Sequence, residues 1–280
     1  MSTLSSDDIK QTVRDRYAEI AKTEGGAGCG CAPSCCSPGE TSATTSVDLG
    51  YRQSDLARLP EGADMGLGCG TPLAFAAVQP GETVVDLGSG GGIDCFLAAT
   101  DVGPTGRVIG VDMTTAMVDK ARRNAQRINI DNVEFRLGEI ERLPLADRSA
   151  DVVVSNCVIN LSPDKPAVFR EAFRVLRPGG RVAISDIVAS APLPEAIRGD
   201  RAALAGCIAG APSIDELRAS LASAGFEDIH IDVNEASRSF VKGWSPESGA
   251  EEFVAAAAIR ATKPAGGGCC GSAPAASSCC

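Results

Sequence analysis

The chain has 280 residues, enough for one sizeable buried core and a small appended lobe. It is acidic, with 36 Asp and Glu against 26 Lys and Arg, and it has no run of five or more basic residues, so nucleic acid and anionic membranes are poor partners. No apolar stretch is long enough to span a bilayer, and the polar N-terminus does not resemble a signal peptide. We therefore expect a cytoplasmic protein without a membrane partner. We also expect a monomer, although the sequence carries no direct signal of oligomeric state.

Twelve cysteines are unevenly distributed along the chain. Because a reducing compartment argues against a disulfide framework, this number favours metal binding or thiol chemistry. Four lie within residues 29–36, and four form two adjacent pairs at 269–270 and 279–280. The remaining four stand singly, at Cys69, Cys95, Cys157 and Cys207.

Residues 1–46 are expected to form an N-terminal helix and a cysteine-rich flexible loop. Apolar side chains recur at helical spacing and predict an amphipathic helix over residues 6–22. They are Ile9, Val13, Tyr17 and Ile20. From residue 25 to residue 45 the composition shifts to Gly, Ser, Thr, Pro and Cys, which predicts a mobile loop unless a bound ion orders it.

Residues 47–193 are expected to form the main core, because apolar strands alternate with helices there. The predicted strands are 83–87, 107–111, 133–137, 152–155 and 182–185, and the first two helices end near residues 100 and 128. Such alternation predicts an α/β fold, a doubly wound and mostly parallel sheet with helices on both faces.

Residues 194–263 are expected to form a small C-terminal α+β lobe. It begins with a helical stretch that contains Cys207 and continues with a helix over 213–224 that ends at a glycine. Two late strands, near 229–233 and 253–261, bring the predicted sheet to seven strands. Residues 264–280 have the composition of a disordered, cysteine-rich tail.

A glycine-rich turn, Gly88-Ser89-Gly90-Gly91-Gly92, follows the first core strand and opens a helix. Glycines let the backbone turn sharply and approach a ligand at the helix N-terminus. Such a turn alone often satisfies only local geometry. Asp112 strengthens the interpretation as a nucleotide-type site, because it ends the next strand, where a carboxylate can accept hydrogen bonds from both ribose hydroxyls.

The glycine spacing and the acid before it distinguish between two candidate cofactors, a nicotinamide dinucleotide and S-adenosylmethionine. Ile93 stands where G-x-G-x-x-G requires its last glycine, and Asp86 would repel a pyrophosphate but neutralise a cationic amino acid end. The Asp-x-Gly-x-Gly-x-Gly pattern resembles Rossmann-like class I methyltransferases, which implies S-adenosylmethionine as cofactor. The residues expected to bind it are Asp86, Gly88, Ser89, Gly90, Gly92, Asp112, Met113, Gly138, Glu139, Ile140 and Asn156, with Gly138, Glu139 and Ile140 flanking the adenine.

Cys157 ends a central strand at the point where most such methyltransferases carry a proline-rich or acidic motif. The carboxyl end of a parallel strand faces the crevice in which ligands bind. Taken alone, Cys157 is as well explained as a small buried hydrophobe. The other single cysteines decide between the two interpretations.

Three segments together resemble the arsenite methyltransferase family: residues 67–72, LGCGTP; residues 155–165, SNCVINLSPDK; and residues 206–210, GCIAG. The resemblance spans roughly residues 13–263. It implies that Cys69, Cys157 and Cys207 hold trivalent arsenic, with arsenite and methylarsenite as substrates. It also implies that a fourth, N-terminal cysteine pairs with the first during turnover. We favour Cys35 or Cys36 for this role, although Cys29 and Cys31 are alternatives.

The chemistry fits arsenic better than zinc, because trivalent arsenic is soft and prefers thiolate ligands. The chain has a single histidine, His230, which we interpret as a strand surface residue, and no C-x-x-C pair builds half of a zinc site. We interpret Cys95 as a packing residue. Tyr17 either closes over the cofactor or packs its helix, and the C-terminal cysteine pairs either capture arsenite or are dispensable.

Methyl transfer would oxidise arsenic, and its return to the trivalent state would leave a protein disulfide, so turnover requires an external thiol reductant, thioredoxin or glutathione. Two alternatives stay open. One is a methyltransferase for a small organic acceptor such as a quinone, with incidental cysteines. The other is a thiol-rich protein that sequesters metal without turnover.

Overall fold

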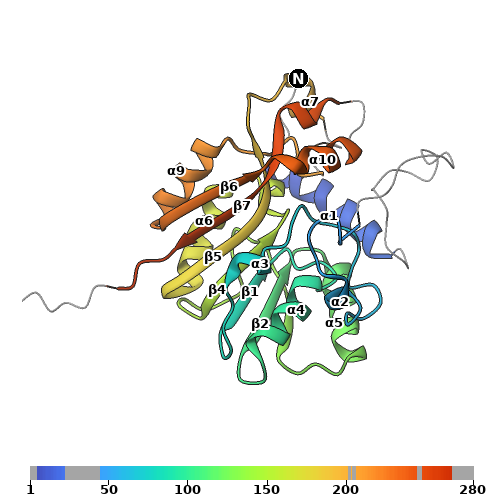
Figure 1. Ribbon diagram of the computed structural model, residues 1–280, viewed down its shortest axis with the longest axis vertical. Coiled ribbons are helices and arrows are strands. Elements are labelled where there is room, and N and C mark those ends of the chain that lie inside the picture. Colours follow the sequence, from blue (N-terminus) through green and yellow to red (C-terminus); the bar gives the residue numbers. More distant parts are fainter. Residues whose placement is uncertain (1–4, 23–44, 201–202, 204–205, 245–247, 267–280) are drawn as a thin grey trace, which may run out of the picture.

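One seven-stranded sheet organises the chain. The structure is a computed structural model that describes residues 5–22, 45–200, 203, 206–244 and 248–266 (Figure 1). The strand order is β3-β2-β1-β4-β5-β7-β6, and only β7 runs antiparallel to its neighbours. The strands are β1 Thr83–Leu87, β2 Arg107–Asp112, β3 Val133–Leu137, β4 Ala150–Asn156, β5 Leu176–Ala189, β6 Glu227–Asn234 and β7 Val254–Thr262. The predicted mostly parallel, seven-stranded sheet is confirmed.

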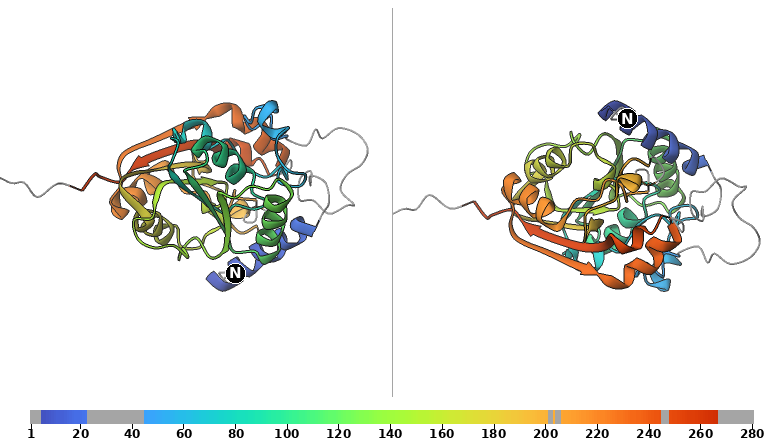
Figure 2. Two further views of the ribbon diagram at one scale, coloured as in Figure 1. Left: turned by 90° about the horizontal axis from the view of Figure 1, so that it is seen from below. Right: turned by 90° about the horizontal axis from the view of Figure 1, so that it is seen from above.

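Helices lie on both sides of this sheet (Figure 2). The α-helices are α1 Ser6–Lys22, α2 Gln53–Leu56, α3 Leu73–Ala76, α4 Ile93–Val102, α5 Thr115–Arg127, α6 Lys165–Val175, α7 Glu195–Arg198, α9 Ile214–Ala224 and α10 Arg238–Trp244. Short 3-10 helices are η1 Ile159–Leu161, η2 Glu235–Ser237 and η3 Ala250–Glu252. Within the described ranges, no helix is both long and apolar enough to cross a membrane.

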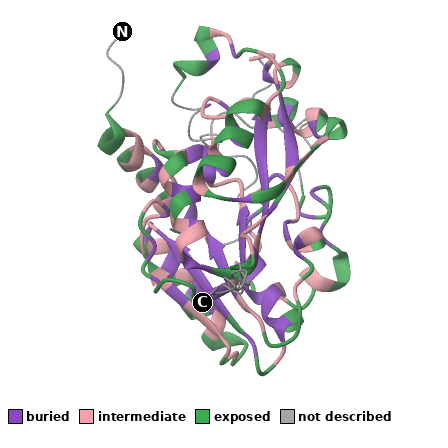
Figure 3. Cartoon of the chain, turned by 90° about the vertical axis from the view of Figure 1, so that its left-hand side faces the viewer, coloured by how far each residue is buried: buried purple, intermediate pink, exposed green. Residues whose placement is uncertain are grey.

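The central strands are buried on both faces (Figure 3), because successive side chains point to opposite sides of a strand. Val84 and Val108 pack with α3, α4 and α5 on one face. Val85 and Ile109 pack with α6 and α9 on the other. Valine- and isoleucine-rich runs thus serve two cores at once, as expected for a sheet covered on both sides.

A third apolar cluster lies beyond the carboxyl ends of the parallel strands. There β5 extends to Ala189, which pairs with Val254 at the start of β7. Val13 of α1, Ile187 of β5 and Val241 of α10 belong to this cluster. In Figure 1, α7 and α10 lie together at this end of the molecule. The cluster forms the base of the C-terminal lobe and also contains the thiols described below.

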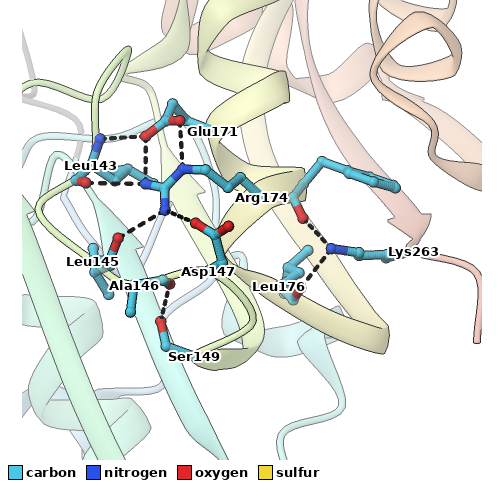
Figure 4. Close-up of polar contacts among 10 residues, drawn as sticks. Leu143, Leu145, Ala146, Asp147, Ser149, Glu171, Arg174, Leu176 and Lys263 are labelled. Carbon is cyan, nitrogen blue, oxygen red and sulfur yellow. Dashed lines mark hydrogen bonds and ion pairs between the residues drawn. The ribbon is translucent and has the colours of Figure 1, made fainter. Parts of the chain in front are cut away.

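The half-buried Arg174 side chain holds the loops at the opposite end of the sheet (Figure 4). The Arg174 guanidinium donates to the carbonyls of Leu143 and Leu145 and forms ion pairs with Glu171 and Asp147. These bonds fix the connection that precedes β4.

Candidate active site

A pocket of about 990 Å³, counted with its open mouth, lies at the carboxyl ends of β1, β2 and β4. The strand order changes direction between β1 and β4, and ligands of open α/β sheets bind at such a switch point. Of the residues predicted to bind the cofactor, the pocket is lined by Asp86, Gly88, Ser89, Gly90, Asp112, Met113, Ile140 and Asn156.

The remaining predicted residues lie near this pocket but outside its lining. Gly92 caps the start of α4, and Gly138 packs against Pro144. The Glu139 carboxylate forms ion pairs with Lys10, at 2.7 Å, and with Arg14, both from α1. Glu139 therefore holds α1 over the site. Lys10, Val13 and Tyr17 of the same helix form one wall of the pocket.

Acidic groups dominate the polar lining of the pocket. Asp86 at the end of β1 is buried and accepts a hydrogen bond from the Cys95 thiol at 3.2 Å, and burial raises its pKa. Asp112 accepts from the backbone N–H groups of Gly90, at 3.0 Å, and Thr114, at 2.8 Å. Within the described part of the chain, the buried Ser89 hydroxyl has no hydrogen-bond partner. The polar lining of the pocket is thus mainly carboxylates.

A buried network links the pocket to the loop that carries Cys69. The Asn156 amide donates to Tyr51 Oη at 2.9 Å and to the Gly70 carbonyl at 2.7 Å, while its oxygen accepts from the Cys69 N–H at 3.0 Å. Tyr51 Oη also contacts Asp94, whose pKa burial raises to about 6. Sequence reasoning missed Tyr51 and Asp94. Asp94 begins the helix after the glycine turn, a position that offered a usable signal.

The three single cysteines expected to act together do converge. The Cys69 and Cys157 sulfurs lie within 4.8 Å of each other, and Cys207 Sγ donates to the Cys157 carbonyl at 2.7 Å. Cys157 lines the pocket, so the sulfur cluster lies against it. Cys95 is not part of this cluster, because its thiol donates to the Asp86 carboxylate.

Two glycines allow the loops that carry Cys69 and Cys207 to approach the strand ends closely. A Cβ on Gly70 would lie 2.6 Å from Ser185 Oγ. A Cβ on Gly210 would lie 2.2 Å from the Asn160 carbonyl oxygen. Because real Cβ atoms do not make such contacts, larger residues at either position would push the thiols apart.

The prediction that Cys207 lies in a helix was wrong, because Cys207 occupies a turn with a φ of 65°. Cys157 has a φ of 56° and is likewise left-handed. Side chains rarely adopt this conformation, which costs roughly 1–3 kcal/mol per residue and persists where surrounding contacts enforce it. For Cys207 an enforcing contact is the Asn160 amide, which donates to its carbonyl at 3.1 Å.

Comparison with known proteins identifies the family. A family model described as a methyltransferase domain matches residues 78–225. An arsenite methyltransferase of Halobacterium salinarum is 52% identical to the chain over 266 residues, which are 92% of this chain and 68% of that relative. The chain belongs to the arsenite methyltransferase family. The resemblance drawn from the three cysteine segments is confirmed.

Two further relatives of this arsenite methyltransferase family member agree. An arsenite methyltransferase of Aquipseudomonas alcaligenes is 44% identical over 179 residues, 61% of this chain and 51% of that relative. A crystal structure of an arsenic (III) S-adenosylmethionine methyltransferase from Chlamydomonas reinhardtii matches with a TM-score of 0.60 at 33% identity, over 78% of this chain and 72% of that one. The chain thus spans about half of the second relative's length.

Asp186, which sequence reasoning missed, lies within the buried strand β5, three residues before its end and beside the thiols. A carboxylate oxygen of Asp186 and the sulfurs of Cys69 and Cys157 all lie within 4.8 Å of one another. The carboxylate accepts from the backbone N–H groups of Ile187, at 2.8 Å, and Ile159, at 3.0 Å, but burial dominates and raises its pKa to about 7. An acid near the carboxyl end of an apolar strand was the available signal.

The three thiols are protonated at neutral pH. Burial raises the pKa of Cys69 to about 11 and that of Cys157 well above its ordinary value. The pKa of Cys207 is raised first by its hydrogen bond with Cys157 and then by burial. The predicted N-terminal partners, Cys35 and Cys36, lie outside the described residues.

The two asparagines that flank Cys157 should each position one thiol. Asn156→Ala removes the contacts to the Cys69 loop, and Asn160→Ala removes those to the Cys207 turn. We expect Asn156→Ala to raise the alkylation rate chiefly at Cys69 and Asn160→Ala chiefly at Cys207, because buried carbonyls lose their donors. Peptide mass spectrometry after timed alkylation measures both, and each variant is the control of the other. Equal increases at both cysteines would contradict this assignment.

Asp186 should make stability depend on pH. Its unfolded pKa is near 3.8 and its folded pKa is about 7, so the folded state holds the extra proton between these values and stability falls as pH rises through that range. Relative to Asp186→Asn, the wild type should lose roughly 2–3 kcal/mol of unfolding free energy between pH 5 and 7. Urea unfolding at each pH measures this, with the exposed Asp131→Asn as control. Parallel profiles for wild type and Asp186→Asn would refute it.

Proposed function

We propose that this chain transfers a methyl group from S-adenosylmethionine to trivalent arsenic bound by Cys69, Cys157 and Cys207, with arsenite and methylarsenite as substrates. The observation that carries the proposal is the convergence of three thiols, from segments far apart in the sequence, beside a class I methyltransferase pocket. Soft thiolate ligands suit this element. The family assignment supports the same activity.

The acidic pocket suits a cationic cofactor. Asp86 and Asp94 lie in the lining where they can neutralise the amino acid end, and Asp112 at the end of β2 can accept from the ribose hydroxyls. The unpartnered Ser89 hydroxyl is a further donor or acceptor. Met113 and Ile140 offer apolar surface for the adenine. S-adenosylmethionine, when bound, supplies an electrophilic methyl group on its sulfonium.

Protonated thiols suit the capture of arsenite. Each thiol gives its proton to a hydroxide of arsenite, which leaves as water, so three arsenic–sulfur bonds form without net proton release. Neutral thiols in an apolar cluster therefore bind arsenite without leaving buried charge behind. This removes the need for thiolates of lowered pKa before binding.

Methyl transfer then needs orientation rather than a base. When bound, S-adenosylmethionine would supply its sulfonium methyl group to the arsenic lone pair, leaving a neutral thioether and a positive charge on arsenic. Arsenic has no proton to lose, so the residues around it contribute positioning and exclusion of water. Met65, Leu67, Val158 and Leu161 provide apolar pocket walls for this.

Turnover requires two electrons, because arsenic has been formally oxidised. We place their source in protein thiols that form a disulfide, with Cys69 and Cys35 or Cys36 as the pair and thioredoxin or glutathione as the external reductant. The free thiols among the described residues support a reducing compartment, the cytoplasm. We further propose that the enzyme acts as a monomer.

Removal of one sulfur should abolish activity without loss of cofactor binding. Cys157→Ser and Cys207→Ser should each lower the rate of arsenite methylation by about a hundredfold or more, because arsenic loses a ligand and its orientation toward the methyl group. The assay separates arsenic species by mass-detected chromatography after incubation with arsenite, S-adenosylmethionine and thioredoxin or glutathione. Affinity for S-adenosylmethionine is the control. Methylation that survives both substitutions would favour an organic acceptor, and arsenic binding without S-adenosylhomocysteine would favour sequestration.

The Asp112 carboxylate should dominate recognition of the cofactor's ribose. Asp112→Ala removes a charged acceptor, and hydrogen bonds to charged groups contribute about 1.5–3 kcal/mol, so affinity should fall about ten- to a hundredfold. Isothermal titration calorimetry with S-adenosylmethionine measures this. Glu134→Gln, on the outer strand β3, is the control and should bind as the wild type does. An unchanged affinity in Asp112→Ala would contradict the assigned role.

A further inference from the structure

Asp186 has no role in the proposed methyl transfer, yet it is buried against the reacting sulfurs. It is 3% exposed, and among the described residues it does not line the cofactor pocket. It lines a separate internal cavity with Asn160 and Ile187. Its carboxylate therefore approaches the sulfur cluster from the interior of the lobe. Backbone N–H groups hold it there, so it cannot swing away without losing their bonds.

We propose that Cys69, Cys157 and Asp186 form a second binding mode of this centre, a site for a thiophilic divalent cation of the zinc or cadmium type. Their ligand atoms lie within 4.8 Å of one another, and Cys69 and Asp186 are each only 3% exposed. Zinc binds thiolate at about 2.3 Å and carboxylate oxygen at about 2.0–2.2 Å, so two ligand atoms on one ion are separated by less than 4.8 Å. Small side-chain adjustments complete the site.

Charge favours this set of ligands. Two thiolates and one carboxylate around a divalent cation leave one net negative charge, after the two thiols have released their protons to solvent. The half-buried Lys165 ammonium interacts electrostatically with Asp186 and Cys207 and offsets that charge. A tetrahedral ion has one position left, for water.

The two ligands of the centre differ in the residues that they use. Trivalent arsenic takes three ligands and keeps a lone pair, so it needs the third sulfur of Cys207 and has no position for a carboxylate. The cation instead has a hard oxygen ligand in Asp186. Both share Cys69 and Cys157, so a bound cation excludes arsenite. This competition rests on the proposed function, whereas the cation site itself does not.

The test exchanges one ligand at a time. The full-length chain carries serine at the eight cysteines of residues 29–36 and 269–280, so that only the four single cysteines remain. Cadmium and arsenite are titrated separately, without cofactor, by calorimetry under anaerobic conditions. Asp186→Asn should weaken cadmium about tenfold or more and arsenite less than about threefold. Cys207→Ser should instead weaken arsenite about tenfold or more and cadmium less than about threefold.

The outcomes separate the two proposals. Cadmium affinity unchanged in Asp186→Asn overturns the cation site, whatever arsenite does. Arsenite affinity unchanged in Cys207→Ser overturns the three-sulfur arsenic site and leaves the cation site standing. Circular dichroism checks that both variants are folded.

A second measurement does not depend on any Asp186 variant. X-ray absorption of the zinc-loaded chain should show a mixed first shell, with sulfur at about 2.3 Å and oxygen at about 2.0 Å. A first shell of sulfur alone would overturn the role of Asp186. In the methylation assay, added cadmium should raise the apparent KM for arsenite, and an effect on the maximum rate alone would contradict competition.

Discussion

The arrangement of this active site depends on five residues of backbone, 156–160, that anchor both of the other cysteine segments. The Asn156 amide holds the Cys69 loop, and the Asn160 amide donates to the carbonyls of Ile187, at 2.7 Å, and Cys207. Cys157 lies between these asparagines with a left-handed backbone. Because the Asn160 amide is buried and the Asn156 amide is half-buried, breaking either contact is costly. The convergence of three sulfurs is therefore set by two amides more than by the sulfurs themselves.

The same segment couples the acceptor site to the cofactor pocket. Asn156 lines that pocket while it holds Cys69, and Tyr51 connects it to Asp94 at the start of α4. A ligand that contacts Asp94 or Asn156 is thus connected through hydrogen bonds to the loop that carries Cys69. Burial raises the pKa values of two groups in this network, Asp94 and Tyr51. Hydrogen bonds between them compensate for the loss of contact with water.

The fold and the three cysteines were predictable because their signals are local. Alternating apolar strands, the glycine turn and the residues around each cysteine are continuous stretches of sequence. The buried carboxylates were harder to predict, because Asp94 and Asp186 acquire their surroundings only when distant strands pair. Cys207 was placed in a helix because its neighbours are alanine-rich, whereas tertiary contacts from Asn160 hold it in a turn. Glu139 follows β3 as expected, but partners from α1, more than a hundred residues earlier, direct its carboxylate.

Burial of the thiols would have opposite consequences for the two ligands proposed for this centre, arsenite and a divalent cation. A raised thiol pKa opposes any ligand that must expel protons to solvent, and it does not oppose arsenite, whose hydroxides carry those protons away as water. Desolvation thus favours the neutral metalloid without any group that recognises it by charge. Asp186 works in the other direction, because a carboxylate beside the sulfurs lowers the cost of a cation and offers nothing to a three-coordinate neutral centre. Selectivity between arsenite and a divalent cation would therefore depend on two factors. Burial of the three thiols would favour arsenite, and the charge of Asp186 would favour the cation.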